Sequence, residues 1–192
     1  MCGLAGVLDR SGESVSPVIL KRMTDAIAHR GPDGEGHYID GPLGLGHRRL
    51  AIIDLSDRAA QPMASADGQH VISFNGEIYN YRELRKELEA RGRIFRTDSD
   101  TEVLLHLYAE KGEAMLAELR GMFAFALWDA RKQALLLARD PFGIKPLYYS
   151  DNGRTFRFAS QVKALLAGGQ VVTAPEPAGH AGFFLWGSVP EP

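Results

Sequence analysis

The chain holds a single cysteine, and it stands at position two, between Met1 and Gly3. Removal of Met1 would place a free α-amine on the same residue as the thiol. A thiol titrates at about 8.5 and an α-amine at about 7.7 to 8.0, so the amine could accept the thiol proton through a water, without a histidine. Cys2 is therefore a candidate nucleophile. The alternative is a buried, inert thiol, since lone cysteines commonly behave as small hydrophobic side chains.

The composition is that of a globular protein, and it excludes several other kinds of chemistry. The chain has 192 residues, of which 45% are hydrophobic and 24% charged, which suits one domain with a sizeable core. A formal net charge of -2, with Lys and Arg scattered singly, offers no basic surface for nucleic acid or an anionic membrane. One cysteine cannot form an internal disulfide, and six histidines lack the paired spacing of a zinc site. We expect no metal in this chain.

We expect no segment of the chain to enter a membrane. The longest apolar stretch, around Gly121 to Trp128, is far shorter than the roughly 20 residues that span a bilayer. The N-terminus has no positively charged region, and its apolar run ends at Asp9, too early for a signal peptide. The sequence therefore predicts a cytoplasmic protein.

Helix signals precede and follow several apolar repeats. Ser16-Pro17 precedes a helical repeat that reaches Arg30, and Asn80 with Glu83 forms a capping-box pattern before a helix over roughly 81–91. Ser99 with Glu102 repeats that pattern before a helix that Gly112 should end, so Asp100 is expected at a helix N-terminus. A short helix is expected over about 114–119.

Strand-like runs occupy most of the remaining chain. Asn75-Gly76 is the preferred pair for a two-residue hairpin turn, which predicts one strand over 70–74 and another over 77–79. Other strands are expected over 4–9, 44–54, 123–128, 134–138, 147–149 and 155–159. Strands joined by short turns, with helices between them, predict an α+β domain of antiparallel sheets with helices packed outside.

Five motifs, in this order along the chain, resemble those of the class II glutamine amidotransferases, in the variant of asparagine synthetase. They cover nearly the whole chain with comparable gaps, which makes the joint match far more specific than any single motif. The motifs are Cys2-Gly3, His29-Arg30-Gly31-Pro32-Asp33, Arg48-Arg49-Leu50-Ala51-Ile52-Ile53-Asp54, Asn75-Gly76-Glu77-Ile78-Tyr79-Asn80 and Arg139-Asp140-Pro141-Phe142-Gly143-Ile144-Lys145-Pro146-Leu147.

The resemblance implies a fold and a reaction. The fold is that of the N-terminal-nucleophile hydrolases, a four-layer αββα sandwich of two antiparallel sheets flanked by helices. In the reaction, Cys2 would attack the side-chain amide of glutamine and form a glutamyl thioester, which water hydrolyses to glutamate, with ammonia released. The Asn75 amide and the Gly76 backbone N–H would stabilise the tetrahedral intermediate, and Gly76 would let the substrate approach closely. From the residues alone, Asn75-Gly76 is simply a turn, and both roles can hold together.

The resemblance also implies which residues bind glutamine. Arg49 would hold the α-carboxylate through two parallel hydrogen bonds, and Asp100 the α-ammonium. Simpler roles exist for both, a solvated strand-end charge for Arg49 and a favourable interaction with the helix dipole for Asp100. Glu77 would add a polar contact, or form a surface salt bridge. The other substrate-binding positions implied are Leu50, Ile52, Ile53, Asn75 and Gly76.

Three other parts of the chain lie outside the predicted catalytic and binding set. Arg30 is expected to hold the turn beside the nucleophile without taking part in catalysis. Residues 139–147 are predicted to be hydrogen-bonded loop scaffolding. Gln161 departs from the family, which often has glutamate after Ala-Ser at this point, and we assign it no role.

The resemblance divides the chain into an amidotransferase domain, residues 1–169, and a segment over 170–192 rich in Pro, Gly and Ala. That segment would begin a linker, with no closing element of its own, to a C-terminal synthetase domain that this sequence lacks. No phosphate-binding glycine loop occurs, so the domain itself needs no cofactor, and ATP and magnesium are expected in the missing domain. Ammonia would serve there to amidate aspartate or another carboxylate. Partners are thus glutamine and the synthetase domain, with no nucleic acid or membrane; a homodimer is compatible with the sequence.

Two other interpretations remain open. One is the glutaminase half of an enzyme that aminates a sugar phosphate or a phosphoribosyl substrate, although the 49–54 and 75–80 runs fit the asparagine type better. The other is a non-catalytic binding module, in which a retained Met1 blocks the nucleophile.

Overall fold

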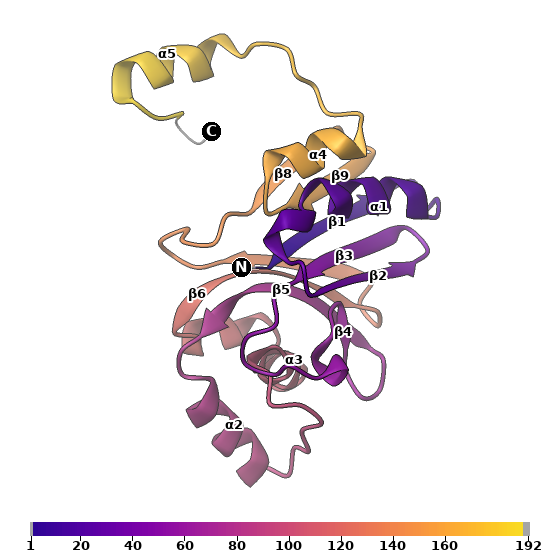
Figure 1. The fold of residues 1–192 in the computed structure, drawn as a ribbon, viewed down its shortest axis with the longest axis vertical. Coiled ribbons are helices and arrows are strands. Elements are labelled where there is room, and N and C mark those ends of the chain that lie inside the picture. The colour runs from indigo at the N-terminus through magenta and orange to yellow at the C-terminus, as the bar shows by residue number, and fades with distance from the viewer. Residues whose placement is uncertain (1, 190–192) are drawn as a thin grey trace.

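The computed structural model describes residues 2–189, which fold into two antiparallel sheets between layers of helices (Figure 1). The first sheet has the order β2 (Gly34–Asp40), β3 (Leu43–Arg49), β1 (Gly3–Asp9), β9 (Thr155–Ala159) and β8 (Tyr148–Asp151). The second has the order β4 (Met63–Ala64), β5 (His70–Ile78), β6 (Gly121–Asp129) and β7 (Ala134–Arg139). All neighbouring strands are antiparallel.

Helices cover the outer face of each sheet. Helices α1 (Pro17–Ala26) and α4 (Val162–Gly168) pack against each other and on the first sheet, and α3 (Asp100–Lys111) packs on β5 of the second with α2 (Tyr81–Ala90) beside it (Figure 1). Short 3-10 turns occupy η1 (Ala28–Arg30), η2 (Asp57–Ala59) and η3 (Gly112–Glu118). The predicted αββα arrangement is confirmed.

Three apolar layers hold the four structural layers together, and the strands alternate between them. On β1, Leu4 lies in the core between the sheets, whereas Ala5 and Val7 lie in the core beneath α1 and α4. On β5, Val71 faces the first sheet and Ile72 faces the helices. This period-two alternation decides which side chains of each strand can meet between the sheets.

The predicted hairpin turn at Asn75-Gly76 is wrong, because β5 runs without interruption from His70 to Ile78. Asn75 pairs with Ala124 and Gly76 with Phe123 on β6. A Cβ on Gly76 would lie 2.4 Å from the carbonyl oxygen of Met122, so the glycine is needed for close approach of the neighbouring strand. Pairing with a strand distant in sequence therefore outweighs the local turn preference.

Strand β3 is shorter than predicted and ends at Arg49, not at Asp54. Arg48 and Arg49 pair with Gly3 and Gly34, the first residues of β1 and β2, so no neighbouring strand continues beyond them. Residues 50–56 consequently form an irregular loop.

The helix starts agree with the sequence, but their caps agree only in part. Ser99 accepts a hydrogen bond from the Thr101 backbone N–H, and Gly112 follows α3 at φ 58°. Asn80 does not cap α2; its side chain bonds instead to Glu118 O and to Arg120 N, which ties the end of β5 to the start of β6. The first helix ends at Ala26, and η1 carries the chain on to Arg30.

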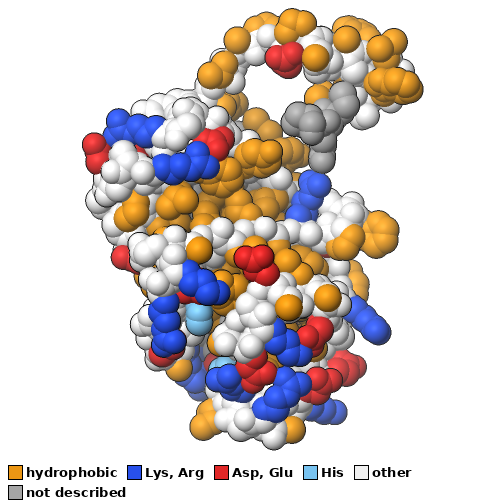
Figure 2. All heavy atoms as spheres, turned by 180° about the vertical axis from the view of Figure 1, so that it is seen from behind, with side chains coloured by type: hydrophobic (Ala, Val, Ile, Leu, Met, Phe, Trp, Pro, Cys, Tyr) orange, Lys and Arg blue, Asp and Glu red, His pale blue; other side chains and the backbone are white. Residues whose placement is uncertain are grey.

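The segment after Gln170 contains a helix, α5 (Pro177–Trp186), where the sequence predicted no closing element. The Glu176 side chain accepts from Ala178 N, Pro177 takes the first helical position, and Gly187 ends the helix in the left-handed region. Apolar side chains crowd its surface, among them Phe184 and Trp186 at 85% and 76% exposure (Figure 2). The prediction for this segment used only its composition, and it therefore missed the residues that mark the two ends of the helix.

Candidate active site

Every residue that the sequence singled out for catalysis or glutamine binding lines the same pocket. Cys2 lies just before β1, and Asp100 is the first residue of α3. The other residues come from the end of β3, from the loop after β3 and from the end of β5. These lining residues are Cys2, Arg49, Leu50, Ile52, Ile53, Asn75, Gly76, Glu77 and Asp100.

The Cys2 thiol is held against the loop after β3. Leu50 N donates to the Cys2 sulfur at 3.3 Å, and the sulfur lies 3.6 Å from Leu50 O. Arg30 Nε donates to Cys2 O at 3.4 Å, which agrees with the expected turn-holding role of Arg30. Burial raises the pKa of the Cys2 thiol, and the Leu50 N–H opposes that rise because it stabilises the thiolate. Met1, and with it the question of its removal, lies outside the described residues.

Asn75 presents an unused donor in this pocket. It lies on the same face of β5 as Val71, toward the first sheet, and is 1% exposed. Its Nδ2 makes no hydrogen bond within residues 2–189. A buried amide N–H without a partner is costly, and native proteins retain such groups where a ligand can use them. Asn75 is therefore poised to donate to an oxygen that enters the pocket.

Arg49 has a structural task as well as a place in the pocket. One terminal nitrogen donates to Ser56 O at 3.0 Å, and the other donates to Asp54 O. The guanidinium thus folds the 50–56 loop around itself. Arg49 is therefore not a solvated strand-end charge, and ligand binding would not be its only role.

Asp100 is a buried carboxylate at the first position of α3. It is 4% exposed, and its Oδ2 accepts from Ile78 N at 3.1 Å. Burial raises the pKa of Asp100 to about 6, against the lowering effect of the backbone hydrogen bonds from Ile78 and Thr101. Simple capping at a helix N-terminus would lower this pKa. Asp100 therefore has an unfavourable charge at neutral pH that a cationic group would stabilise.

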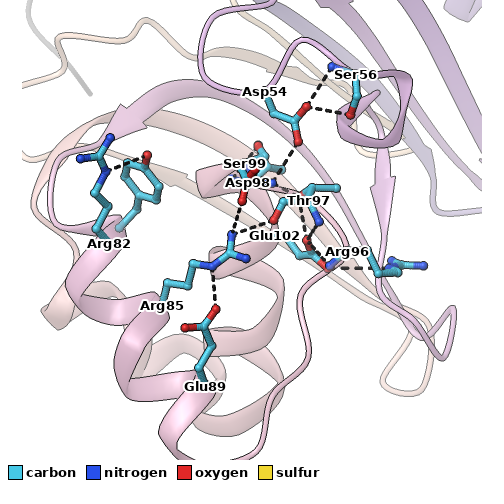
Figure 3. Close-up of polar contacts among 12 residues, drawn as sticks. Asp54, Ser56, Arg82, Arg85, Glu89, Arg96, Thr97, Asp98, Ser99 and Glu102 are labelled. Carbon is cyan, nitrogen blue, oxygen red and sulfur yellow. Dashed lines mark hydrogen bonds and ion pairs between the residues drawn. The ribbon is translucent and has the colours of Figure 1, made fainter.

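A polar network fixes the start of α3 and so the place of Asp100 (Figure 3). Asp54 accepts from Ser56 N at 2.8 Å and from Asp98 N at 2.9 Å, which joins the loop after β3 to the segment before α3. Arg85 on α2 donates to Thr97 O at 2.7 Å. Glu102, instead of closing the predicted capping box on Ser99, accepts from the backbone of the segment before α3 at Arg96 and Thr97.

Sequence reasoning missed several residues that line the pocket, and two of them, Asp54 and Lys145, carry a charge. The 139–147 segment was predicted to be scaffolding, and Asp140 supports this because its carboxylate accepts from Phe142, Ile144 and Lys145 backbone N–H groups. Yet Lys145 also lines the pocket and is 2% exposed. The sequence feature that could have pointed to Lys145 as a pocket residue is its place in a glycine-containing turn. The other lining residues missed are Asp54, Ala59, Gln61, Phe74, Ser99, Thr101 and Met122.

Residues 2–189 contain no group of three or more His, Cys, Asp and Glu side chains arranged to hold a metal ion. Within that part of the chain, no helix is long and apolar enough to cross a membrane.

Gln161, the departure noted in the sequence, is the N-cap residue immediately before α4. Its side-chain Oε1 is buried and accepts no hydrogen bond within the described residues. We find no structural reason for glutamine at this position.

Comparison with known proteins identifies close relatives over nearly the whole chain. A family model described as a glutamine amidotransferase domain matches residues 1–192. The chain is 48% identical over 169 residues to asparagine synthetase [glutamine-hydrolyzing] 1 of Bacillus subtilis (strain 168), a match that covers 86% of this chain and 27% of that protein. It is 41% identical over 191 residues to asparagine synthetase B [glutamine-hydrolyzing] of Escherichia coli (strain K12), which covers 97% and 33%. The chain thus spans about a third or less of these relatives.

Among solved structures, the fold is similar to that of a glutamine phosphoribosylpyrophosphate amidotransferase from B. subtilis, determined with ADP and GMP. The TM-score is 0.74 at 25% sequence identity, and the match covers 87% of this chain and 43% of that one. The fold is therefore shared with a glutamine phosphoribosylpyrophosphate amidotransferase, whereas sequence identity is higher with the asparagine synthetases.

Proposed function

This chain belongs to the glutamine amidotransferase domain family, and on that premise we propose that it hydrolyses glutamine to glutamate and ammonia with Cys2 as the nucleophile. The observation that carries the proposal is the meeting of the Cys2 thiol and the unused Asn75 amide donor in one pocket. A nucleophile and an oxyanion donor are the two groups that acyl transfer requires.

The reaction begins with loss of the thiol proton. Once Met1 has been removed, the α-amine of Cys2 accepts that proton, through a water. The sulfur attacks the side-chain carbonyl carbon of glutamine, and negative charge develops on the carbonyl oxygen. Asn75 Nδ2 and the Gly76 backbone N–H donate to that oxygen. The amine returns the proton to the leaving nitrogen, ammonia departs, and water hydrolyses the thioester to glutamate and regenerates the thiol.

Substrate binding uses the two charges at the edges of the pocket. Arg49 binds the α-carboxylate while it keeps its bonds to the 50–56 loop, so substrate binding and loop order are coupled. Asp100 binds the α-ammonium, which stabilises a carboxylate that burial otherwise makes unfavourable. Leu50, Ile52, Ile53 and Glu77 form part of the walls.

The ammonia is used by another part of a longer protein, since the relatives extend well beyond the matched region. We propose that residues 1–169 form the amidotransferase domain and that 170–192, with α5, leads to an ATP- and magnesium-dependent synthetase domain. That domain would amidate aspartate or another carboxylate in the cytoplasm. A homodimer is compatible with this scheme.

The test is the intact mass of the purified chain before and after treatment with 6-diazo-5-oxo-L-norleucine, a reactive glutamine analogue. We expect a mass that lacks Met1 and gains one adduct, and no adduct in Cys2→Ala. A chain that retains Met1 should be trimmed enzymatically and treated again. Labelling after trimming supports the proposal, and continued absence of an adduct favours the non-catalytic binding module.

A further inference from the structure

Gln61 is a pocket residue to which the proposed mechanism gives no role, although both ends of its side-chain amide are bonded. Gln61 Oε1 accepts from the Phe74 backbone N–H at 2.6 Å, and Gln61 Nε2 donates to Thr101 Oγ1 at 3.3 Å. Phe74 immediately precedes Asn75, and Thr101 immediately follows Asp100. One side chain therefore joins the strand that carries the proposed oxyanion donors to the start of the helix that carries the ammonium-binding carboxylate.

Gln61 lies at the edge of the second sheet, at a point where no strand covers β5. Strand β4 is two residues long, and its first residue, Met63, pairs with Ile72 of β5. The same antiparallel register would place residue 61 opposite Phe74. There the side-chain oxygen of Gln61, instead of a backbone carbonyl, accepts from the Phe74 N–H. Phe74 is 3% exposed, and loss of this bond would leave a buried N–H unpaired, which is costly.

The Gly76 backbone N–H points to this same edge of β5. Gly76 pairs with Phe123 of β6. Phe123 directs its own backbone groups away from β5, because its N–H donates to Asp140 Oδ2 at 3.2 Å and its carbonyl accepts from Asp140 N at 2.8 Å. In an antiparallel ladder, a pair of this kind exchanges no hydrogen bonds, so the backbone groups of Gly76 face away from β6. Gly76 accordingly lines the pocket.

Three N–H groups therefore follow one another along this edge, since alternate residues of a strand direct their backbone groups to the same side. The first belongs to Phe74 and donates to Gln61. The third belongs to Ile78 and donates to Asp100 Oδ2 at 3.1 Å. The middle group belongs to Gly76 and is the proposed oxyanion donor. Its position is consequently fixed by a side chain on either side.

The backbone of Gln61 is itself fixed by the first sheet. A Cβ on Gly36 of β2 would lie 2.0 Å from Gln61 O, so the glycine lets the Gln61 backbone pack directly against this strand. The Gln61 side chain thus reaches β5 from a backbone that is held by the other sheet. Such an anchor can resist movement of the β5 edge relative to the residues on the first sheet.

We propose that Gln61 is a positioning residue for the oxyanion site. Its bond to the Phe74 N–H keeps the neighbouring Gly76 N–H directed at the carbonyl oxygen of bound glutamine. This inference rests on the proposed function. In this role Gln61 moves no proton, and it acts through the backbone of β5.

The test compares glutamine hydrolysis by the wild type and by Gln61→Met, which removes the amide but keeps an unbranched side chain of similar length. Oxyanion donors act in the transition state, and a displacement of about 1 Å can lower a rate about 100-fold. We expect kcat to fall about 10- to 100-fold, with KM within about threefold of the wild-type value. Gln69→Met, which removes a glutamine amide from the exposed turn before β5, should change neither quantity.

Alkylation of Cys2 by iodoacetamide separates positioning from a general loss of pocket structure. Cys2 is the single cysteine of the chain, so every thiol adduct reports on it. Alkylation forms no oxyanion, and its rate in Gln61→Met should therefore match that of the wild type. An unchanged kcat in a folded Gln61→Met protein would overturn the proposal. Equal falls in kcat and in the alkylation rate would also overturn it, as would a change in KM alone.

The wild type gives a second measurement, which decides the matter if Gln61→Met does not fold. Amide hydrogen exchange followed by NMR should be slow at Phe74 and Ile78, whose N–H groups are bonded, and faster at Gly76 between them. Equal protection at all three positions would overturn the proposal. Glutamine hydrolysis by the wild type, with Met1 removed, distinguishes the two levels of inference. Its absence refutes the proposed function, whereas activity together with an unchanged kcat in Gln61→Met refutes only the role of Gln61.

Discussion

Replacement of Asp100 by asparagine should stabilise the fold at neutral pH while it weakens glutamine binding. The carboxylate is 4% exposed, and burial raises its pKa from 3.8 to about 6. A carboxyl group whose pKa is raised on folding contributes stability that is fully present below the unfolded-state pKa. That contribution is lost as the pH rises through the folded-state pKa.

The magnitude follows from the size of the shift. Each pKa unit corresponds to about 1.4 kcal/mol, so a rise of about two units makes the ionised form unfavourable by about 3 kcal/mol, an upper limit because water reaches the pocket. Asparagine has no charge to bury, and its side-chain oxygen can still accept from Ile78 N, as Asp100 Oδ2 does at 3.1 Å. The stability of Asp100→Asn should therefore lack the loss between about pH 4 and pH 7 that this carboxyl causes in the wild type.

Urea unfolding of both proteins at pH 4 and pH 8 provides the assay. We expect the two free energies of unfolding to be similar at pH 4, and the variant to be more stable at pH 8 by up to about 3 kcal/mol. The KM for glutamine should rise in the variant because the α-ammonium loses its anion. Asp98→Asn, which removes an exposed carboxylate two residues away, should change neither quantity appreciably. A variant that is less stable than the wild type at pH 8, with an equal deficit at pH 4, would refute the reasoning.

Three other substitutions test the remaining parts of the site. Asn75→Ala should lower kcat by about 100- to 1,000-fold with little change in KM, since one oxyanion donor is lost; steady-state kinetics would contradict this if KM alone changed. Arg49→Lys should raise the KM for glutamine by about tenfold or more, because lysine cannot bond a carboxylate in two places and also hold Ser56 O; equal KM values would show that Arg49 serves the loop alone. Gly76→Ala should lower the free energy of unfolding by about 1–3 kcal/mol, since its Cβ would lie 2.4 Å from Met122 O. Gly34→Ala, whose Cβ would have no neighbour closer than 3.5 Å, is the matched control in urea unfolding.

Local chemistry allowed the sequence to predict the element types and Cys2 as a candidate nucleophile. The helix starts at Tyr81 and Asp100 were predicted from capping patterns and apolar spacing, which depend on residues within one or two turns, although of the two N-cap residues only Ser99 makes a cap hydrogen bond. The candidate role of Cys2 follows from its own thiol and the amine that Met1 removal would expose. The motifs supplied the rest of the candidate site, and the fold places those residues around one pocket.

Tertiary structure alone decided features that depend on partners distant in sequence. Asn75-Gly76 is part of a strand because β6 pairs along the whole of β5, and β3 stops at Arg49 because its neighbours begin there. The raised pKa of Asp100 and the burial of Lys145 arise from packing between segments far apart in the chain. Local spacing contains no information on such desolvation, because the low-dielectric surroundings exist only after the layers have packed together.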